Sequence, residues 1–255
     1  MEVHHHSHLA SGETHTSRKK WTHYFWEFLM LFLAVFCGFM AENQREHYIE
    51  KIRAKDYARA LIHDLENDTT QLVDILKQVE NLVDNYDRFL KISKDPKQAS
   101  YAQLYYYGSF AIGMSDFTSN VSTLDQIKNS GSIRYFDAHL QDKISEYARL
   151  VDRNKDYKPF GISIHNRSVD LWNKIFNVEL IDNAMQWKWK QEAVDAFLLT
   201  KPPLLNNDPN LLKEFSNTLV GKKRSELSME LVYYKPALRQ ASDLIIMLKK
   251  EYHLK

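Results

Sequence analysis

Apolar residues near the start of the chain form one continuous run. It extends from Tyr24 to Ala41, and Glu27 is its only charged residue. At the rise of an α-helix the run would be about 27 Å long, close to the hydrocarbon thickness of a bilayer. We therefore expect residues 24–41 to form a transmembrane helix.

Two other interpretations of this run are a cleaved export signal and the core helix of a soluble protein. Cleavage needs small residues before the cut, and a cut after Ala41 would place Phe39 at one of those positions. A lipoprotein-type cut before Cys37 would need a small residue where Phe36 stands. A buried soluble helix remains the alternative, because the run is near the lower length limit for a span.

The charges that flank the run predict an orientation. Arg18, Lys19 and Lys20 precede it as a compact cluster, whereas the basic residues after it are about as numerous but are interspersed with acidic ones. Basic residues favour the cytoplasmic side of a membrane. We expect a short cytoplasmic tail (1–23), one span in the inner membrane, and an extracytoplasmic domain (42–255), periplasmic in a Gram-negative bacterium.

Four residues of the run share one helical face, namely Glu27, Ala34, Gly38 and Ala41. Small residues at this spacing let two transmembrane helices approach closely, and an ionisable group within a span usually faces a protein partner. One hypothesis is therefore a homo-oligomer interface along this face. The alternative is that Glu27 lies one turn inside the membrane and its side chain reaches the headgroups.

Beyond the run, apolar residues recur with heptad spacing and predict a long helix. One series comprises Ala58, Leu65, Leu72, Val79 and Tyr86, and the other comprises Leu61, Ile75, Leu82 and Phe89. Asp68 interrupts the second series, and residues 42–93 contain neither Gly nor Pro. We expect one helix, continuous with the span, whose apolar seam packs against the rest of the chain.

Local signals predict the helices that would cover this seam. Ser122 and Asp125 have the spacing of a capping box, and Gly131 would end the short helix that follows. Asp137 can cap a second helix, which Pro159 and Gly161 would kink or break.

A last helix is expected to begin at Pro209 with Asp208 as its cap, and to be weakest at Gly221 and Pro236. The chain has only seven Gly and six Pro, which favours few, long elements. We predict an all-α fold, an antiparallel helical bundle beside the membrane.

Composition and motifs narrow the function. Lys and Arg (34) nearly balance Asp and Glu (33), so a nucleic-acid partner is not expected. The sequence contains no nucleotide-binding loop, no zinc-protease motif, no nucleophile elbow and no paired-cysteine metal site. We therefore expect no cofactor and no enzymatic activity, although an enzyme whose buried polar site is assembled from distant helices stays an alternative.

Three stretches together carry a resemblance to a known family: "GFMAENQREH" at the end of the run, "LIHDLENDTTQL" (61–72) and "STLDQIKNSGSIR" (122–134). The second contains the pattern L-x-x-D-L-x-x-D, and the third contains L-x-x-I-K-x-S-G-x-I. In their order and spacing they resemble a bacterial family of single-pass membrane proteins of unknown function. The "HHHSH" near the N-terminus departs from that pattern. The resemblance implies an anchor followed by a helical domain, and no activity.

Asp68 would be costly to bury without a partner, because it occupies a seam position. One hypothesis is that Asp68 pairs with Lys128 or Arg134 and thereby fixes the register of the long helix. The alternative is that the seam opens locally and the carboxylate is solvated.

Two clusters could bind ligands. The histidines His4, His5, His6 and His8 could hold a transition metal, or form an incidental solvated tail. The aromatic residues Tyr101, Tyr105 and Phe110 could line a ligand pocket, or fill the end of the bundle.

Two functions remain in competition. The first is a scaffold or accessory subunit that is anchored in the lipid bilayer and acts through contacts with an unknown protein partner. The second is an extracytoplasmic module that senses a small ligand and signals through a partner, because the tail before the span is too short for an output domain. A closed, water-free core would favour the scaffold, and a cavity lined by the aromatic residues of 101–110 would favour the sensor.

Overall fold

The computed structural model describes residues 18–95, 100–186 and 188–254. Within these ranges the chain is helical and contains no strand. The first helix, α1 (Arg18–Ile92), runs without interruption through both the apolar run and the heptad seam, as predicted. The chain divides into two compact units, and the boundary between Arg53 and Ala54 falls inside α1.

The first unit contains the apolar run. Side chains from Trp21 to Met40 are almost all exposed, and they include large ones such as Phe28, Leu31 and Phe39. In the described part of the chain, α1 is the one helix that is long and apolar enough to cross a membrane. The exposed apolar surface of this segment needs an apolar environment to cover it.

The second unit is the predicted antiparallel bundle. Its long helices are α1 from Ala54 onward, α4 (Ala138–Ile175) and α7 (Pro209–Met229), and α7 continues through a π-helical turn, η3 (Glu230–Tyr234), into α8 (Lys235–Glu251). Helix α4 contacts both α7 and α8 along its length. Both heptad series predicted on α1 are buried, so the seam forms the centre of the bundle.

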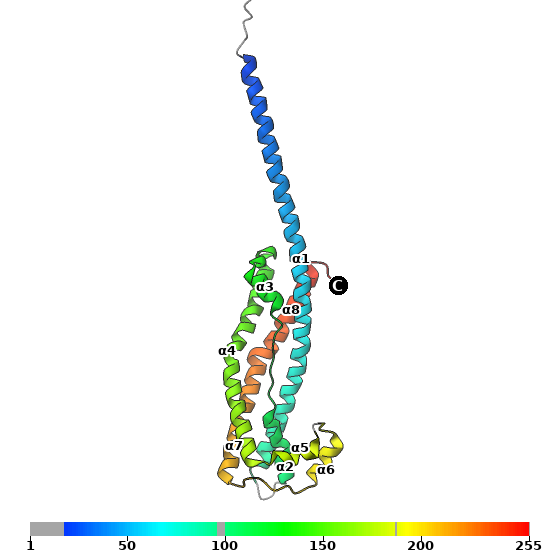
Figure 1. Cartoon of the computed structure of the whole chain (residues 1–255), viewed down its shortest axis with the longest axis vertical. Helices are drawn as coiled ribbons and strands as arrows, with labels where there is room; N and C mark the ends of the chain where they lie inside the picture. The colour runs from blue at the N-terminus through cyan, green and yellow to red at the C-terminus, as the bar shows by residue number, and fades with distance from the viewer. Residues whose placement is uncertain (1–17, 96–99, 187, 255) are drawn as a thin grey trace, which may run out of the picture. The chain divides into compact units, whose positions relative to one another are not determined.

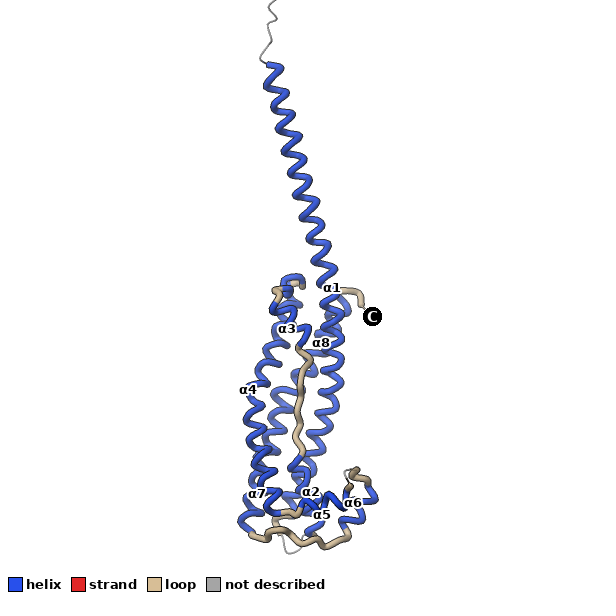
Figure 2. Tube along the Cα trace, viewed as in Figure 1, coloured by secondary structure: helices blue, strands red, loops and turns tan. Residues whose placement is uncertain are grey.

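Short elements close the two ends of the bundle. They are α2 (Tyr101–Ser109), η1 (Phe110–Ile112), α3 (Ser122–Asn129), η2 (Ser132–Tyr135), α5 (Val178–Met185) and α6 (Gln191–Leu198). Between η1 and α3 the extended segment 113–121 runs lengthwise along the helices (Figure 2). Its side chains alternate, with Ser115 and Phe117 buried and the residues after each exposed, as in a strand that lies on a core.

Two predicted helix starts are confirmed. The Asp137 carboxylate accepts hydrogen bonds from the backbone N–H groups of His139 and Leu140, and Asp208 accepts one from Asn210 in front of Pro209. Both are N-caps that satisfy donors at the first turn of a helix. The short helix α3 ends before Gly131, whose φ of 68° is left-handed, as expected.

Two local predictions are wrong. Ser122 does not cap α3 through its side chain, and Asp64 on α1 accepts the N–H of Thr123 instead. Helix α4 also continues through Pro159, so the break that was predicted there does not occur. Proline leaves a carbonyl of the preceding turn without a donor. Because Pro159 is on an exposed face, water can satisfy that carbonyl.

Candidate functional site

Two apolar clusters fill the bundle, and both α1 and α4 contribute to each of them. On α7 and its continuation, Leu219 belongs to one cluster and Tyr233 to the other. Between them lie Lys222 and Glu226, which are 2% and 6% exposed. Burial of charged groups is costly, so a polar layer between two apolar cores requires specific partners.

Lys222 is held by three acceptors. Its Nζ donates to the backbone carbonyl of Ala111, lies 3.1 Å from His165 Nδ1, and lies 3.4 Å from Ser168 Oγ. Burial lowers the pKa of Lys222 to about 8. Burial and the nearby ammonium also lower the pKa of His165, which keeps the ring neutral and leaves Nδ1 able to accept.

Glu226 lies one turn further along α7 and is bound from the extended segment. Ser115 Oγ donates to its carboxylate, and Tyr234 OH lies 3.2 Å from the same Oγ. Burial raises the pKa of Glu226, while the hydrogen bonds from Ser115 and the charge of Lys222 oppose that rise. Burial likewise raises the pKa of Tyr234 to about 12, so its hydroxyl stays protonated and can donate.

A cavity of about 320 Å³ opens beside these groups. Its polar lining includes Glu226, Tyr234 and Asn154, and its apolar lining includes Met114 and Ile162. The Asn154 Oδ1 atom is buried without a hydrogen-bond partner in the described structure. This oxygen is shielded from solvent, so the polar groups that the cavity offers to a ligand are the others in its lining, such as Glu226 and Tyr234.

An ion pair and a glycine of α4 also line the cavity. Lys158 Nζ lies 2.8 Å from a carboxylate oxygen of Asp116, and both side chains are partly exposed. Gly161 lines the cavity nearby, and a Cβ built on it would meet no atom within 4 Å. The absence of a side chain at this position leaves space for a ligand.

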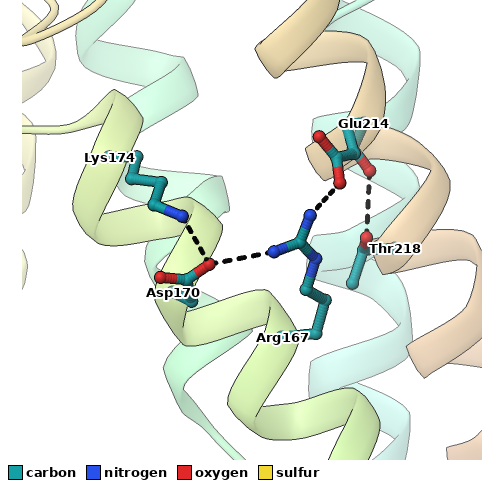
Figure 3. Close-up of polar contacts among 5 residues, drawn as sticks. All are labelled: Arg167, Asp170, Lys174, Glu214 and Thr218. Carbon is teal, nitrogen blue, oxygen red and sulfur yellow. Dashed lines mark hydrogen bonds and ion pairs between the residues drawn. The ribbon is translucent and has the colours of Figure 1, made fainter.

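An exposed network joins α4 to α7 beyond this layer (Figure 3). Arg167 pairs with Asp170 in its own helix at 3.0 Å and with Glu214 on α7, and Lys174 also lies 2.8 Å from Asp170. Thr218 donates to the backbone carbonyl of Glu214. All the charged members are about half exposed, so the network contributes little to stability and marks the outer face of the two helices.

Asp68 is bound differently from the prediction. It is fully buried and accepts hydrogen bonds from Ser119 Oγ, from the backbone N–H of Asn120 at 2.8 Å and from Tyr147 OH at 2.7 Å. Lys128 instead forms an ion pair with Asp152 at 3.1 Å. Arg134 stacks on the ring of Tyr135, with 5.2 Å between its Cζ and the ring centroid.

The predicted pairing of Asp68 with Lys128 or Arg134 is therefore wrong, and so is the alternative of a solvated carboxylate. Neutral hydrogen-bond donors bind the Asp68 carboxylate in place of the predicted cation. Asp64, one turn earlier, accepts from Asn120 Nδ2 and from the N–H of Thr123. The stretches 61–72 and 122–134 thus contact each other through Asp64 and Thr123, and together Asp64 and Asp68 hold the segment that leads into α3.

Two other predicted sites are the oligomer interface on the apolar run and the histidine metal site near the N-terminus. Glu27, Ala34, Gly38 and Ala41 are exposed, and Glu27 lies 3.1 Å from His23. His4, His5, His6 and His8 lie outside the described residues. In the ranges that are described, no group of three His, Cys, Asp or Glu residues is placed to hold a metal ion.

The residues of the predicted aromatic pocket do not line one common pocket in the structure. Tyr105 is buried, and its hydroxyl donates to the Pro203 carbonyl and accepts the N–H of Asn177, both at 2.8 Å. It fills the end of the bundle, as the alternative proposed. Phe110 does line a hollow, together with Tyr106, but Tyr101 and Tyr105 do not.

The polar layer at Lys222 and Glu226 was missed from the sequence, although a signal exists. Leu212, Phe215 and Leu219 define a buried stripe on α7, with spacings of three and then four residues. Lys222 and Glu226 continue that stripe in the same register.

Comparisons of this chain with protein-family models, with curated proteins and with solved structures find no match.

Proposed function

We propose that this protein is a membrane-anchored module that binds a small ligand in the cavity beside Glu226 and acts through a protein partner. The observation that carries the proposal is a cavity of about 320 Å³ whose lining combines the buried ionisable groups Lys222 and Glu226 with apolar side chains. That volume is within the range of small-molecule sites. A perturbed acid and a perturbed base in one cavity also favour a functional role.

Binding is favoured over catalysis because the ionisable groups are already engaged. Lys222 Nζ has three acceptors, and the Glu226 carboxylate accepts from Ser115. A general base or nucleophile needs to reach the reacting atom. The cavity offers hydrogen-bond donors such as the Tyr234 hydroxyl, acceptors such as the Glu226 carboxylate, and apolar surface, which suits a small molecule that has both polar and apolar parts.

Placement of the ligand site outside the cytoplasm rests on the basic cluster Arg18, Lys19 and Lys20 before the apolar run. With this orientation the bundle would meet an extracytoplasmic ligand, and a partner in the membrane would carry the signal inward. This arrangement agrees with the resemblance to single-pass membrane proteins.

A pair of glycine substitutions tests the ligand site. Gly161→Leu adds a side chain at a residue that lines the cavity, whereas Gly221→Leu adds the same side chain at an open helical position outside its lining. The full chain, extracted in a mild detergent and examined by native mass spectrometry, should carry a small-molecule adduct in the wild type and in Gly221→Leu. Gly161→Leu should lose it. An adduct that is equally retained in both variants would refute the ligand site.

A scaffold that acts through oligomer contacts is the second candidate, and the exposed face of Glu27, Ala34, Gly38 and Ala41 favours it. With Cys37 replaced by serine, Gly38→Cys should form disulfide-linked dimers in membranes. Phe36→Cys, on another face of the helix, is the matched control. Equal crosslinking at positions 36 and 38 would remove the support for this interface.

A further inference from the structure

A second hollow of about 790 Å³ lies where α2, η1 and α5 meet the turn before α6, at one end of the bundle. Its apolar lining includes Tyr106, Phe110, Ile112, Ile181, Met185 and Trp189. Ile181 and Met185 are buried and form its floor, whereas Ile112 and Trp189 are nearly half exposed at its edge. The hollow is separate from the polar cavity and has no residue in common with its lining.

Aromatic rings form one wall of this groove. The ring centroids of Tyr106 and Trp189 are 6.0 Å apart, and those of Tyr106 and Phe110 are 5.6 Å apart with the rings nearly perpendicular. Trp189 has a φ of 42°, a left-handed conformation that is rare for a bulky residue and concentrates at functional positions. The backbone there holds an exposed indole over the groove instead of burying it.

The charged groups that line the groove are both acidic. Glu179 and Asp182 are spaced three residues apart on α5, so they lie on the same side of that helix, and both are exposed. Among the described residues neither carboxylate forms an ion pair. Lys188 and Lys190 flank Trp189 in the sequence but do not line the groove.

We propose that this groove binds an organic cation with an apolar body, such as a quaternary ammonium compound. The faces of Tyr and Trp rings attract cations, and a cation that loses water against such rings gains most when carboxylates lie at the rim. A volume of about 790 Å³ accommodates a cation with an apolar chain or ring. This ligand is additional to the one proposed for the polar cavity.

The test uses two probes that differ in charge alone. Choline and 3,3-dimethylbutan-1-ol have nearly the same shape, because a carbon replaces the nitrogen. Saturation-transfer difference NMR with the full chain in a neutral detergent should give choline an affinity about tenfold higher than that of the alcohol. Absence of choline binding, or equal binding of the two probes, would overturn the proposal.

Four variants locate the effect. The double substitution Glu179→Gln with Asp182→Asn should lower choline binding to the level of the alcohol. Glu192 is an exposed acid outside the groove, so Glu192→Gln should leave the binding of choline and of the alcohol unchanged. Trp189→Leu should weaken choline binding. Gly161→Leu, which adds a side chain at the lining of the polar cavity, should leave it intact. Choline binding that survives loss of both carboxylates, or that disappears in Gly161→Leu, would overturn the assignment.

Discussion

The buried ammonium of Lys222 gives the stability of the bundle a specific dependence on pH. Its pKa is about 8 in the folded chain and 10.5 ordinarily, so between these values the unfolded chain binds the proton more strongly. The contribution of Lys222 to the free energy of unfolding therefore rises with pH between these two values. We expect the free energy of unfolding to increase by about 1 to 2 kcal/mol from pH 8 to pH 9.5, measured by urea unfolding.

The variant Lys222→Met isolates this effect, because it keeps a long side chain and removes the charge. It should lack the rise between pH 8 and pH 9.5. Buried tyrosines such as Tyr234 have raised pKa values, and their contribution is lost only above the ordinary value of 10. The range from pH 8 to pH 9.5 lies below the ordinary tyrosine pKa of 10. The same pH slope in both proteins would contradict the assignment of the rise to Lys222.

Close packing at Gly108 makes a second prediction for a single residue. A Cβ there would lie 2.7 Å from Trp172 and 3.1 Å from Phe89, both fully buried. Gly108→Ala should therefore destabilise the bundle by about 1 to 3 kcal/mol. Gly221→Ala has open space in a helix and should stabilise it by about 0.5 to 1 kcal/mol. Thermal unfolding measures both, and a stabilising Gly108→Ala would contradict the packing.

The polar layer shows which parts of a candidate site can be predicted from the sequence and which cannot. Lys222 and Glu226 stand on a helical stripe that is otherwise apolar, and that register can be read from the sequence. Their partners Ser115 and His165 come from distant segments. No local pattern pairs those segments, so the cavity follows only from tertiary packing.

At the scale of elements, the extended segment 113–121 is held to α1 by Asp68. This carboxylate has three donors and no exposure, so its replacement leaves donors unpaired. Asp68→Asn should lower the free energy of unfolding by about 1 to 3 kcal/mol. Asp74→Asn, an exposed acid on the same helix, should change it by less than about 0.5 kcal/mol. Equal effects in urea unfolding would contradict this role of Asp68.

The helices were more predictable than the segments between them. The heptad seam on α1 fixed which residues are buried, because a packed helix repeats its contacts every three or four residues. Segment 113–121 has no helical period, and its alternation is too short to stand out. Pro159 was misread because the cost of proline in a helix depends on exposure, which the sequence does not state.

At the scale of the whole molecule, the central proposal is that the apolar run anchors the chain in a membrane and so limits what the bundle can meet. Residues Trp21 to Met40 expose apolar side chains, and the helix that carries them is continuous with the bundle's α1. Exposed apolar surface of this extent is unfavourable in water, since each Å² costs roughly 25 cal/mol. A ligand-binding bundle on such an anchor would act beside the bilayer.

Alkaline carbonate extraction of membranes from cells that express the full chain tests this claim most directly. The treatment releases peripheral proteins and leaves integral ones in the pellet. If residues 24–41 span the bilayer, as we propose, the intact chain stays in the pellet and enters solution only with detergent. Recovery of the chain in the carbonate supernatant, or of a shortened chain in the soluble fraction before extraction, would contradict the account.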